Sequence, residues 1–529
     1  MEELKEFLAK QNEEIKKRVV PASLAYWKAT ISGKKEDYGD YEKRVIEIQK
    51  YLSNKENFEK VKNLLKNAKD HIEKRQLELL YNDYLSCQGD IELIKEITKK
   101  STEIEQKFNT FRAKIGDREL TDNEIKDILK TEKDSEKLME VWEASKKQGE
   151  LVEKDLIELI KLRNKLARSL GFKNYHTMSL ELSEQKEEEV EKIFLELEKS
   201  SRKTFDKLKD EIDEIFSKRY KIDKKDLKPW HYQNLFFQEA PQIYDVDLNK
   251  LYSDNILKIA ETFYKNIGLD VTGILARSDL YEKPGKYQHA YCIDIDREGD
   301  VRIMESVKNN EYWMKTTLHE LGHAIDFSNR DKTLPFLLRP EAHTFVTEAI
   351  ALLFERNSNN ISFMKRYVKI NDEEIEKIKE IVKRQKQLDE LIFLEWSQVM
   401  FNFERELYQN PEQDLNKLWW DLVKRYQKIN FYRDKPDWAS KIHLATSPAY
   451  YHNYLLGKIL TSHINNSIVK EILGGDISSP DYSNPKIGIF LKKKIFSHGK
   501  KYRWDELIRR SLGEELTSKY FIEEFCKSD

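Results

Sequence analysis

Apolar side chains recur at intervals of three and four residues along much of the chain. The segment 187–220, EEEVEKIFLELEKSSRKTFDKLKDEIDEIFSKRY, shows this most clearly, because its apolar positions form one stripe among charged residues. Those positions are Val190, Ile193, Phe194, Leu197, Phe205, Leu208, Ile212, Ile215 and Phe216. The spacing predicts an amphipathic α-helix with one buried face. With Gly 17 and Pro 11 in 529 residues, helix breakers are scarce, so a mainly α fold is expected.

One stretch, 287–307, departs from the helical period. QHAYCIDID alternates and is rich in β-forming residues, REGD supplies a turn with Gly299, and VRIMESV follows. The pattern predicts a β-hairpin, whose edge could hold an extended peptide by main-chain hydrogen bonds. The sequence contains no internal repeat, low-complexity tract or Ser/Gly-rich linker. One continuous domain over residues 1–529 is therefore expected.

Composition narrows the class of protein. Lys+Arg 93 against Asp+Glu 95 gives a net charge of -2, which offers no bulk attraction to nucleic acid or to an anionic membrane. Three cysteines, Cys87, Cys292 and Cys526, lie far apart, so a disulfide framework is not expected. The N-terminal residues lack a signal-peptide core, and no window has the apolar length of a membrane span. We therefore expect a cytoplasmic monomer.

The strongest chemical signal is TTLHELGHAIDF, residues 316–327, which contains H-E-x-x-H. On a helix His319 and His323 share a face, so both could bind one zinc ion, with Glu320 able to reach the reacting water. A third ligand is needed, and Glu348, in HTFVTEAIALLFER, could be delivered by a returning helix. Glu341 is nearer in sequence, but it follows Pro340 and has the position of an N-terminal helix residue.

Chance alone would produce this motif in roughly 2% of such chains. Two incidental histidines on an exposed helix are the alternative. The apolar residues that precede the motif, among them Trp313 and Leu318, argue against that alternative. So does Gly322, because a glycine inside a helix costs about 1 kcal/mol relative to alanine and calls for close packing as a reason. The sequence predicts one zinc ion per chain.

Beyond the zinc motif, five further segments stand out between about 160 and 460. They are RNKLARSLGFKNY (163–175), LYEKPGKYQHAYCIDI, LPFLLRPEAHTFVTEAI, LWWDLVKRYQ and KIHLATSPAYYHNYLLG. In these segments and in their order, the chain resembles the angiotensin-converting enzyme (peptidyl-dipeptidase A) family of zinc peptidases. The resemblance implies a two-lobed helical peptidase with a deep central channel, a zinc-site core at about 285–460 and lid-like N-terminal helices at about 1–100.

The resemblance also implies roles for individual residues. His319, His323 and Glu348 would bind zinc, and Glu320 would be the general base and later the acid. His443 and Tyr454 would stabilise the tetrahedral intermediate. His289 and the backbone of Ala290 would lie along the substrate. In the family a Lys, a Gln and a Tyr hold the substrate's terminal carboxylate. Lys441 and Gln238 match the Lys and the Gln. Tyr451 matches the Tyr if one residue is inserted after Ser447–Pro448; without that insertion Tyr450 matches.

The chain also departs from the family. Asn453 and Val423 stand where its chloride-dependent members have arginines, so chloride activation is not expected. Leu352 stands where the family has an aspartate four residues after the zinc glutamate. Asp326 is the candidate to replace that partner.

The sequence therefore predicts a zinc peptidase that releases dipeptides from the C-termini of short peptides. A thimet- or PepF-like oligoendopeptidase and a metallocarboxypeptidase share the same motifs and remain open. So does an inactive, peptide-binding relative, although the intact Glu320 argues against it. A helical scaffold with an incidental metal site has no positive support in the sequence.

Overall fold

The computed structural model describes residues 2–244, 246, 248–287, 289–475 and 480–527. Over these residues the fold is mainly α, as predicted, with two antiparallel sheets of two strands each. No helix among them is long and apolar enough to cross a membrane. The chain divides into two compact units, which are Met1–Gln88, Val246–Glu380 and Leu456–Tyr520, and Gly89–Asp245, Ile381–Leu455 and Phe521–Asp529. The single domain, the lid and the channel expected from the sequence stay predictions.

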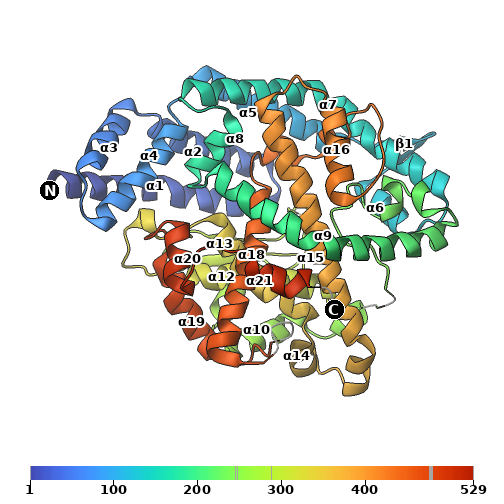
Figure 1. Cartoon of the computed structure of the whole chain (residues 1–529). Helices are drawn as coiled ribbons and strands as arrows, with labels where there is room; N and C mark the ends of the chain where they lie inside the picture. The colour runs from blue at the N-terminus through green and yellow to red at the C-terminus, as the bar shows by residue number, and fades with distance from the viewer. Residues whose placement is uncertain (1, 245, 247, 288, 476–479, 528–529) are drawn as a thin grey trace. The chain divides into compact units, whose positions relative to one another are not determined.

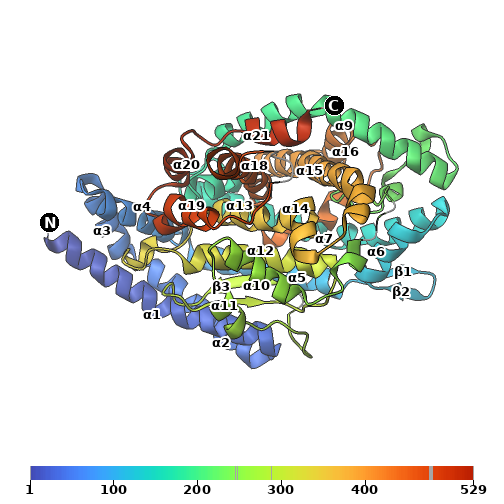
Figure 2. The same ribbon diagram turned by 90° about the horizontal axis from the view of Figure 1, so that it is seen from below.

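The first unit contains the N-terminal helices and the H-E-x-x-H helix (Figure 1). Its elements are α1 (Glu2–Ser32), α2 (Lys35–Leu52), α3 (Lys55–Asn67), α4 (His71–Ser86), α10 (Ile256–Asn266), α11 (Thr272–Arg277), β3 (Tyr291–Asp294), β4 (Val301–Met304), α12 (Glu311–Ser328), α13 (Thr344–Glu355), α14 (Ile361–Phe363), α19 (Lys486–Lys494) and α20 (Trp504–Leu512). Most of α18 (His452–Ile468) also belongs to it. Figure 2 shows α12 beside α10 and β3, against which it packs.

Helices α12 and α13 pack closely because Gly322 has no side chain. A Cβ atom at this position would lie 2.7 Å from the Cα of Ala351 on α13. Leu318, Leu321 and Ile325 of α12 are fully buried in the same core. The glycine inside the motif therefore has the packing role that the sequence indicated, and it brings together the two helices that carry the metal-ligand candidates.

The predicted hairpin is present in the first unit. Strands β3 and β4 pair antiparallel from Tyr291 opposite Met304 to Asp294 opposite Val301. Gly299 in the connecting turn has a φ of 122°, which favours glycine. Residue 288, within the predicted segment, lies outside the described residues. The sequence analysis did not find the other hairpin, β1 (Ala113–Ile115) with β2 (Arg118–Leu120), because its strands are too short to show a period.

The second unit is built around long helices. Its elements are α5 (Ile91–Thr110), β1, β2, α6 (Asp122–Thr131), α7 (Ser135–Ser169), α8 (Tyr175–Leu182), α9 (Glu187–Tyr220), α16 (Leu415–Gln427), α17 (His443–Thr446) and most of α15 (Asp372–Gln409). Helix α21 (Lys519–Phe521) ends in it. Helix α9 is the amphipathic helix predicted from 187–220. Seven of its nine stripe residues are buried, and Ile193 and Ile215 are half-buried.

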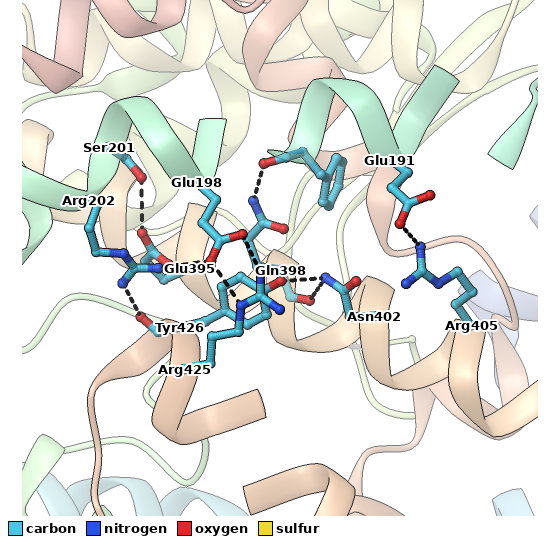
Figure 3. Close-up of polar contacts among 11 residues, drawn as sticks. Glu191, Glu198, Ser201, Arg202, Glu395, Gln398, Asn402, Arg405, Arg425 and Tyr426 are labelled. Carbon is cyan, nitrogen blue, oxygen red and sulfur yellow. Dashed lines mark hydrogen bonds and ion pairs between the residues drawn. The ribbon is translucent and has the colours of Figure 1, made fainter. Parts of the chain in front are cut away.

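Polar contacts join α9, α15 and α16 (Figure 3). The buried carboxylate of Glu395 on α15 accepts a hydrogen bond from Ser201 on α9 at 3.1 Å. Arg425 on α16 makes a bidentate pair with Glu198 at 2.9 Å for both bonds. Gln398, three residues after Glu395, donates to a backbone carbonyl of α9. These contacts join the C-terminal half of α15 and helix α16 to α9.

Candidate active site

His319, His323 and Glu348 come together in the first unit. Their candidate ligand atoms all lie within 4.8 Å of one another. The Oε2 atom of Glu348 is 3.9 Å from Nε2 of His319 and 3.6 Å from Nε2 of His323. Ligands about 2.0–2.2 Å from a tetrahedral zinc ion stand at similar separations from one another. Two imidazole nitrogens and one carboxylate oxygen form a donor set that suits zinc.

Local sequence positions these side chains. Asn310 caps α12, accepting the backbone N–H of Trp313 at 2.9 Å, and the side chain of His343 caps α13. Each cap fixes the residue at which its helix begins. The start of each helix in turn sets which of its side chains face the other helix. Gly457 on α18 leaves room for the third ligand, since a Cβ there would lie 3.1 Å from Cγ of Glu348.

Nδ1 of His319, the ring nitrogen that is not a candidate metal ligand, has a carboxylate partner. It lies 2.6 Å from Oε2 of Glu355, and the other oxygen of Glu355 pairs with Lys315 at 3.1 Å. This bond fixes the proton on Nδ1 and leaves Nε2 free for a metal. The sequence analysis expected Asp326 in this role. Glu355 fills it instead, because it lies two helical turns after Glu348 on the same face of α13.

Nδ1 of His323 has a hydroxyl partner, Thr347. It lies 2.9 Å from Oγ1 of Thr347, which also hydrogen-bonds the carboxylate of Asp326. Asp326 is buried and pairs with Arg330 at 3.1 Å. Asp326 therefore reaches the second histidine, through Thr347, and not the first.

The charges around the triad favour binding a cation. Burial alone would lower the pKa of His319, but Glu348 and Glu355 raise it to about 10. Burial lowers the pKa of His323 well below its usual value, and the cationic His319 lowers it further. Without a metal, His319 is therefore an imidazolium at neutral pH, with a proton on each ring nitrogen. A divalent cation would take the place of the proton on Nε2.

Glu320 lies beside the triad and next to strand β3. Burial raises the pKa of Glu320 to about 7, against the opposing effect of His319. The backbone N–H of Cys292 on β3 donates to its carboxylate. His289 and Ala290 lie immediately before β3; His289 is exposed, with its ring 5.3 Å from that of Tyr287, and Ala290 is half-buried. Their contact with a substrate stays a prediction.

Glu341, the nearer acidic candidate, lies before α13 and outside the triad. Its carboxylate pairs with Arg330 at 3.2 Å. Among the described residues, the group that could hold a metal contains Glu348 and not Glu341.

Lys441 is buried among aromatic side chains of the second unit. Its side chain is only 6% exposed, and its Nζ donates to Oε1 of Gln238 at 2.5 Å. Nζ also lies 5.1 to 5.3 Å from the ring centres of Phe236, Trp396 and Tyr451. Burial lowers the pKa of Lys441 to about 7. Glu239 acts on the pKa of Lys441 in the opposite direction to burial. The three predicted carboxylate-binding residues thus lie together.

The tyrosines after His443 point in different directions. Trp396 donates its indole N–H to the hydroxyl of Tyr451 at 2.6 Å, whereas Tyr450 packs on Tyr454 with ring centres 5.3 Å apart. Tyr451 also contacts His443 and Tyr454, at 5.2 and 5.3 Å between ring centres. Burial lowers the pKa of His443 to about 4, and its Nδ1 is buried without a hydrogen-bond partner. Of the two tyrosines left open, Tyr451 lies beside Lys441.

The positions that bear on chloride are neutral and engaged elsewhere. Asn453 is buried and accepts a hydrogen bond from Gln185 at 2.8 Å. Val423 is buried as well. Leu352, which stands where the family has an aspartate after its zinc glutamate, is also buried.

Four side chains around these sites were not predicted from the sequence: Glu355, Thr347, Phe236 and Trp396. Glu355 had a usable signal, because it lies about two helical turns after Glu348. Thr347, directly before Glu348, had none, because adjacent residues of a helix do not share a face. Phe236 and Trp396 had none, since aromatic residues are most often core.

A comparison with known protein families identifies the chain. The sequence model of the angiotensin-converting enzyme family matches residues 1–527. The chain belongs to the angiotensin-converting enzyme family. The resemblance seen in the sequence is therefore confirmed, and the protein belongs to a family of metallopeptidases.

Two curated relatives are similar at low identity. "Carboxypeptidase 1" from Bacillus subtilis (strain 168) is 23% identical over 257 residues, which cover 44% of this chain and 51% of that protein. "Thermostable carboxypeptidase 1" from Pyrococcus furiosus is 22% identical over 417 residues, which cover 72% of this chain and 75% of that protein. The match thus spans about half the length of the first relative and three quarters of the second.

Proposed function

We propose that the protein is a zinc-dependent peptidase that releases dipeptides from the free C-termini of short peptides, without chloride activation. The observation that carries the proposal is the triad of His319, His323 and Glu348 with Glu320 beside it. The donor set of two histidines and one carboxylate is one that zinc prefers. Nδ1 of each histidine already has a partner, which leaves Nε2 for the metal. One zinc ion per chain is proposed.

When bound, zinc would polarise the scissile carbonyl and make the attacking water more acidic. Glu320 would accept a proton from that water and later deliver it to the leaving amine. Its buried position beside β3 suits a group that must change protonation state near neutral pH. His443 and Tyr454 would donate hydrogen bonds to the negative charge that develops on the carbonyl oxygen.

The second unit supports recognition of a free C-terminus. Lys441 is buried, and its Nζ donates to the neutral amide of Gln238, while the charge of Glu239 offsets only part of the effect of burial on its pKa. A substrate carboxylate would supply a negative charge beside Nζ, with Gln238 and the Tyr451 hydroxyl as further partners. His289 and the backbone of Ala290 would hold the extended peptide. Release of two residues at a time rests on the resemblance to the family.

The test is mass spectrometry of an N-terminally blocked peptide about eight residues long, incubated with zinc-loaded protein. The proposal expects a ladder that shortens by two residues from the C-terminus, and it expects the C-terminally amidated peptide to be a much poorer substrate. The Glu320→Gln variant is the control, because any hydrolysis that it retains comes from another source. Equal cleavage of the free and amidated peptides would reject the carboxylate pocket.

Two other reaction types are outcomes of the same experiment. The names of both relatives favour a carboxypeptidase, which would shorten the peptide by one residue at a time. Internal cuts insensitive to amidation would indicate an oligoendopeptidase. No turnover with intact zinc binding would indicate a peptide-binding relative.

We further propose a cytoplasmic monomer with neither nucleic acid nor membrane as a partner. All three cysteines are free, which suits a reducing compartment.

A further inference from the structure

Residues 443–451 carry His443 and both candidate tyrosines, and two buried charged side chains hold their backbone. One is Arg163 on α7, which is 4% exposed, and the other is Glu404 on α15, which is 3% exposed. Neither side chain has a role in the function proposed above. Arg163 opens the segment RNKLARSLGFKNY, which resembles the family but has no chemistry of its own.

Arg163 binds the carbonyl end of α17. Its Nη1 donates to the carbonyl of Leu444 at 2.8 Å, and its Nη2 donates to that of Ala445 at 2.6 Å. Nη1 also donates to the hydroxyl of Tyr408 on α15 at 3.2 Å. The planar fork of a guanidinium group suits two neighbouring carbonyls, which a four-residue helix leaves without partners of its own.

The same segment of α7 is fixed to α15. Asn164 donates from Nδ2 to the carbonyl of Tyr408 at 2.9 Å and accepts the backbone N–H of Tyr175 at 2.9 Å. The rings of Tyr175 and Tyr408 stack at 5.5 Å. The motif therefore builds a rigid base from which Arg163 reaches residues 444 and 445.

Glu404 holds the next part of the segment. Its Oε1 accepts the backbone N–H of Ala449 at 2.7 Å. Ala449 has a φ of 52°, in the left-handed region that residues with a Cβ disfavour. The preceding residue, Pro448, has no N–H to donate. A buried carboxylate that accepts the backbone N–H of Ala449 therefore stabilises a conformation that a residue with a Cβ disfavours.

The left-handed Ala449 lies two residues before the tyrosine that meets Lys441. Tyr450 and Tyr451 both pack on Tyr454, and Tyr451 also accepts the indole N–H of Trp396 and lies beside Lys441. Trp396 lies about two helical turns before Glu404 on α15. One helix therefore carries both the group that holds the left-handed residue and the group that receives the tyrosine.

We propose that Arg163 and Glu404 are positioning residues, which hold residues 444–449 so that Tyr451, and not Tyr450, completes the carboxylate pocket with Lys441 and Gln238. The proposal rests on the proposed function, because its effect is on recognition of a free C-terminus. It also predicts a structural property, a protected amide at Ala449, that does not depend on any activity.

The experiment compares Glu404→Leu with Glu404→Gln in the full-length zinc-loaded protein, and measures kcat and KM for a free-acid peptide and its amide. Leucine removes the acceptor for Ala449, whereas glutamine keeps a carbonyl oxygen there. We expect Glu404→Leu to raise KM for the free acid about tenfold, the size of a lost hydrogen bond to a charged group, with kcat changed much less. Glu404→Gln restores KM to near the parent value.

Glu395→Leu is the matched control. It removes an equally buried carboxylate from the same helix, but the partners of Glu395 are Ser201 and Arg202 on α9 (Figure 3). It should leave the ratio of free-acid to amide turnover unchanged. If Glu404→Leu and Glu395→Leu change that ratio equally, the effect is general destabilisation and the proposal is wrong.

Two measurements keep the proposal testable if Glu404→Leu does not fold. Tyr451→Phe should lose most of the preference for the free acid and Tyr450→Phe should not; the reverse result overturns the proposal. Hydrogen exchange of the unmodified protein should show a protected amide at Ala449, and an amide as fast as in an unstructured peptide overturns it as well. If the parent enzyme shows no preference for the free acid, the proposed recognition of the substrate carboxylate is wrong. That result does not depend on the rate of hydrogen exchange at Ala449.

Discussion

The bond between His319 and Glu355 gives the sharpest prediction. Glu355→Gln keeps the shape of the side chain and removes its charge. The Nδ1–Oε2 distance of 2.6 Å is that of a charge-assisted hydrogen bond, and both side chains are only 18% exposed. The substitution should therefore weaken zinc binding without removing any proposed ligand.

The expected loss of zinc affinity follows from the role of Glu355 as the hydrogen-bond partner of a metal ligand. Changing a residue that orients a metal ligand lowers metal affinity about 10–100-fold, or about 1.4–2.7 kcal/mol. Glutamine can still accept the Nδ1 proton, so we expect the lower end, about tenfold. Lys315, the other partner of Glu355, is 45% exposed and will be solvated, so its loss adds little.

The assay is competition for zinc with a chromophoric chelator at fixed pH, with circular dichroism of the metal-free protein to check folding. Glu311→Gln is the matched control, because Glu311 is a carboxylate at the start of α12 that contacts Ser358. It should bind zinc within about twofold of the parent. The reasoning is refuted if Glu355→Gln also binds within twofold, or if Glu311→Gln loses as much affinity.

Three further predictions follow from packing, titration and catalysis. Gly322→Ala places a Cβ 2.7 Å from the Cα of Ala351 and should lower the free energy of unfolding, measured in urea, by about 1–3 kcal/mol. Gly39→Ala on α2 has open space around it, so it should leave that free energy unchanged or raise it. Similar effects of both variants would contradict the packing argument. Burial lowers the pKa of Lys441 from 10.5 to about 7, so the unfolded chain binds the extra proton between these values and stability should rise with pH across that window. Lys441→Met should remove this rise, on the order of 4 kcal/mol, and a parent-minus-variant difference that stays flat from pH 7 to 10 would contradict it. Glu320→Gln should lower kcat about 10²–10⁴-fold while still binding zinc, and a chelator should abolish activity that added zinc restores; activity that survives both treatments would exclude the proposed site.

Much of the fold and part of the site follow from local sequence. The stripe of α9 and the alternation of the β3–β4 hairpin are periodicities of 3.6 and 2 residues, which a chain shows without reference to distant partners. The pairing of His319 with His323 is local in the same way, because a helix places residues four apart on one face. Gly322 indicated close packing, because a glycine inside a helix lowers its stability and is expected only where a side chain would not fit.

Contacts between distant segments decided the rest. That Glu355 and not Asp326 serves His319 depends on how α13 lies against α12. The choice of Tyr451 over Tyr450 depends on the left-handed Ala449, whose N–H is held by Glu404, 45 residues earlier. The charge state of Lys441 depends on burial among Phe236, Trp396 and Tyr451. The sequence by itself determined which residues could do chemistry, since spacing along one helix or strand is a local property. Only the tertiary structure decided their partners, their burial and their pKa, because those come from segments that meet only when the chain is folded.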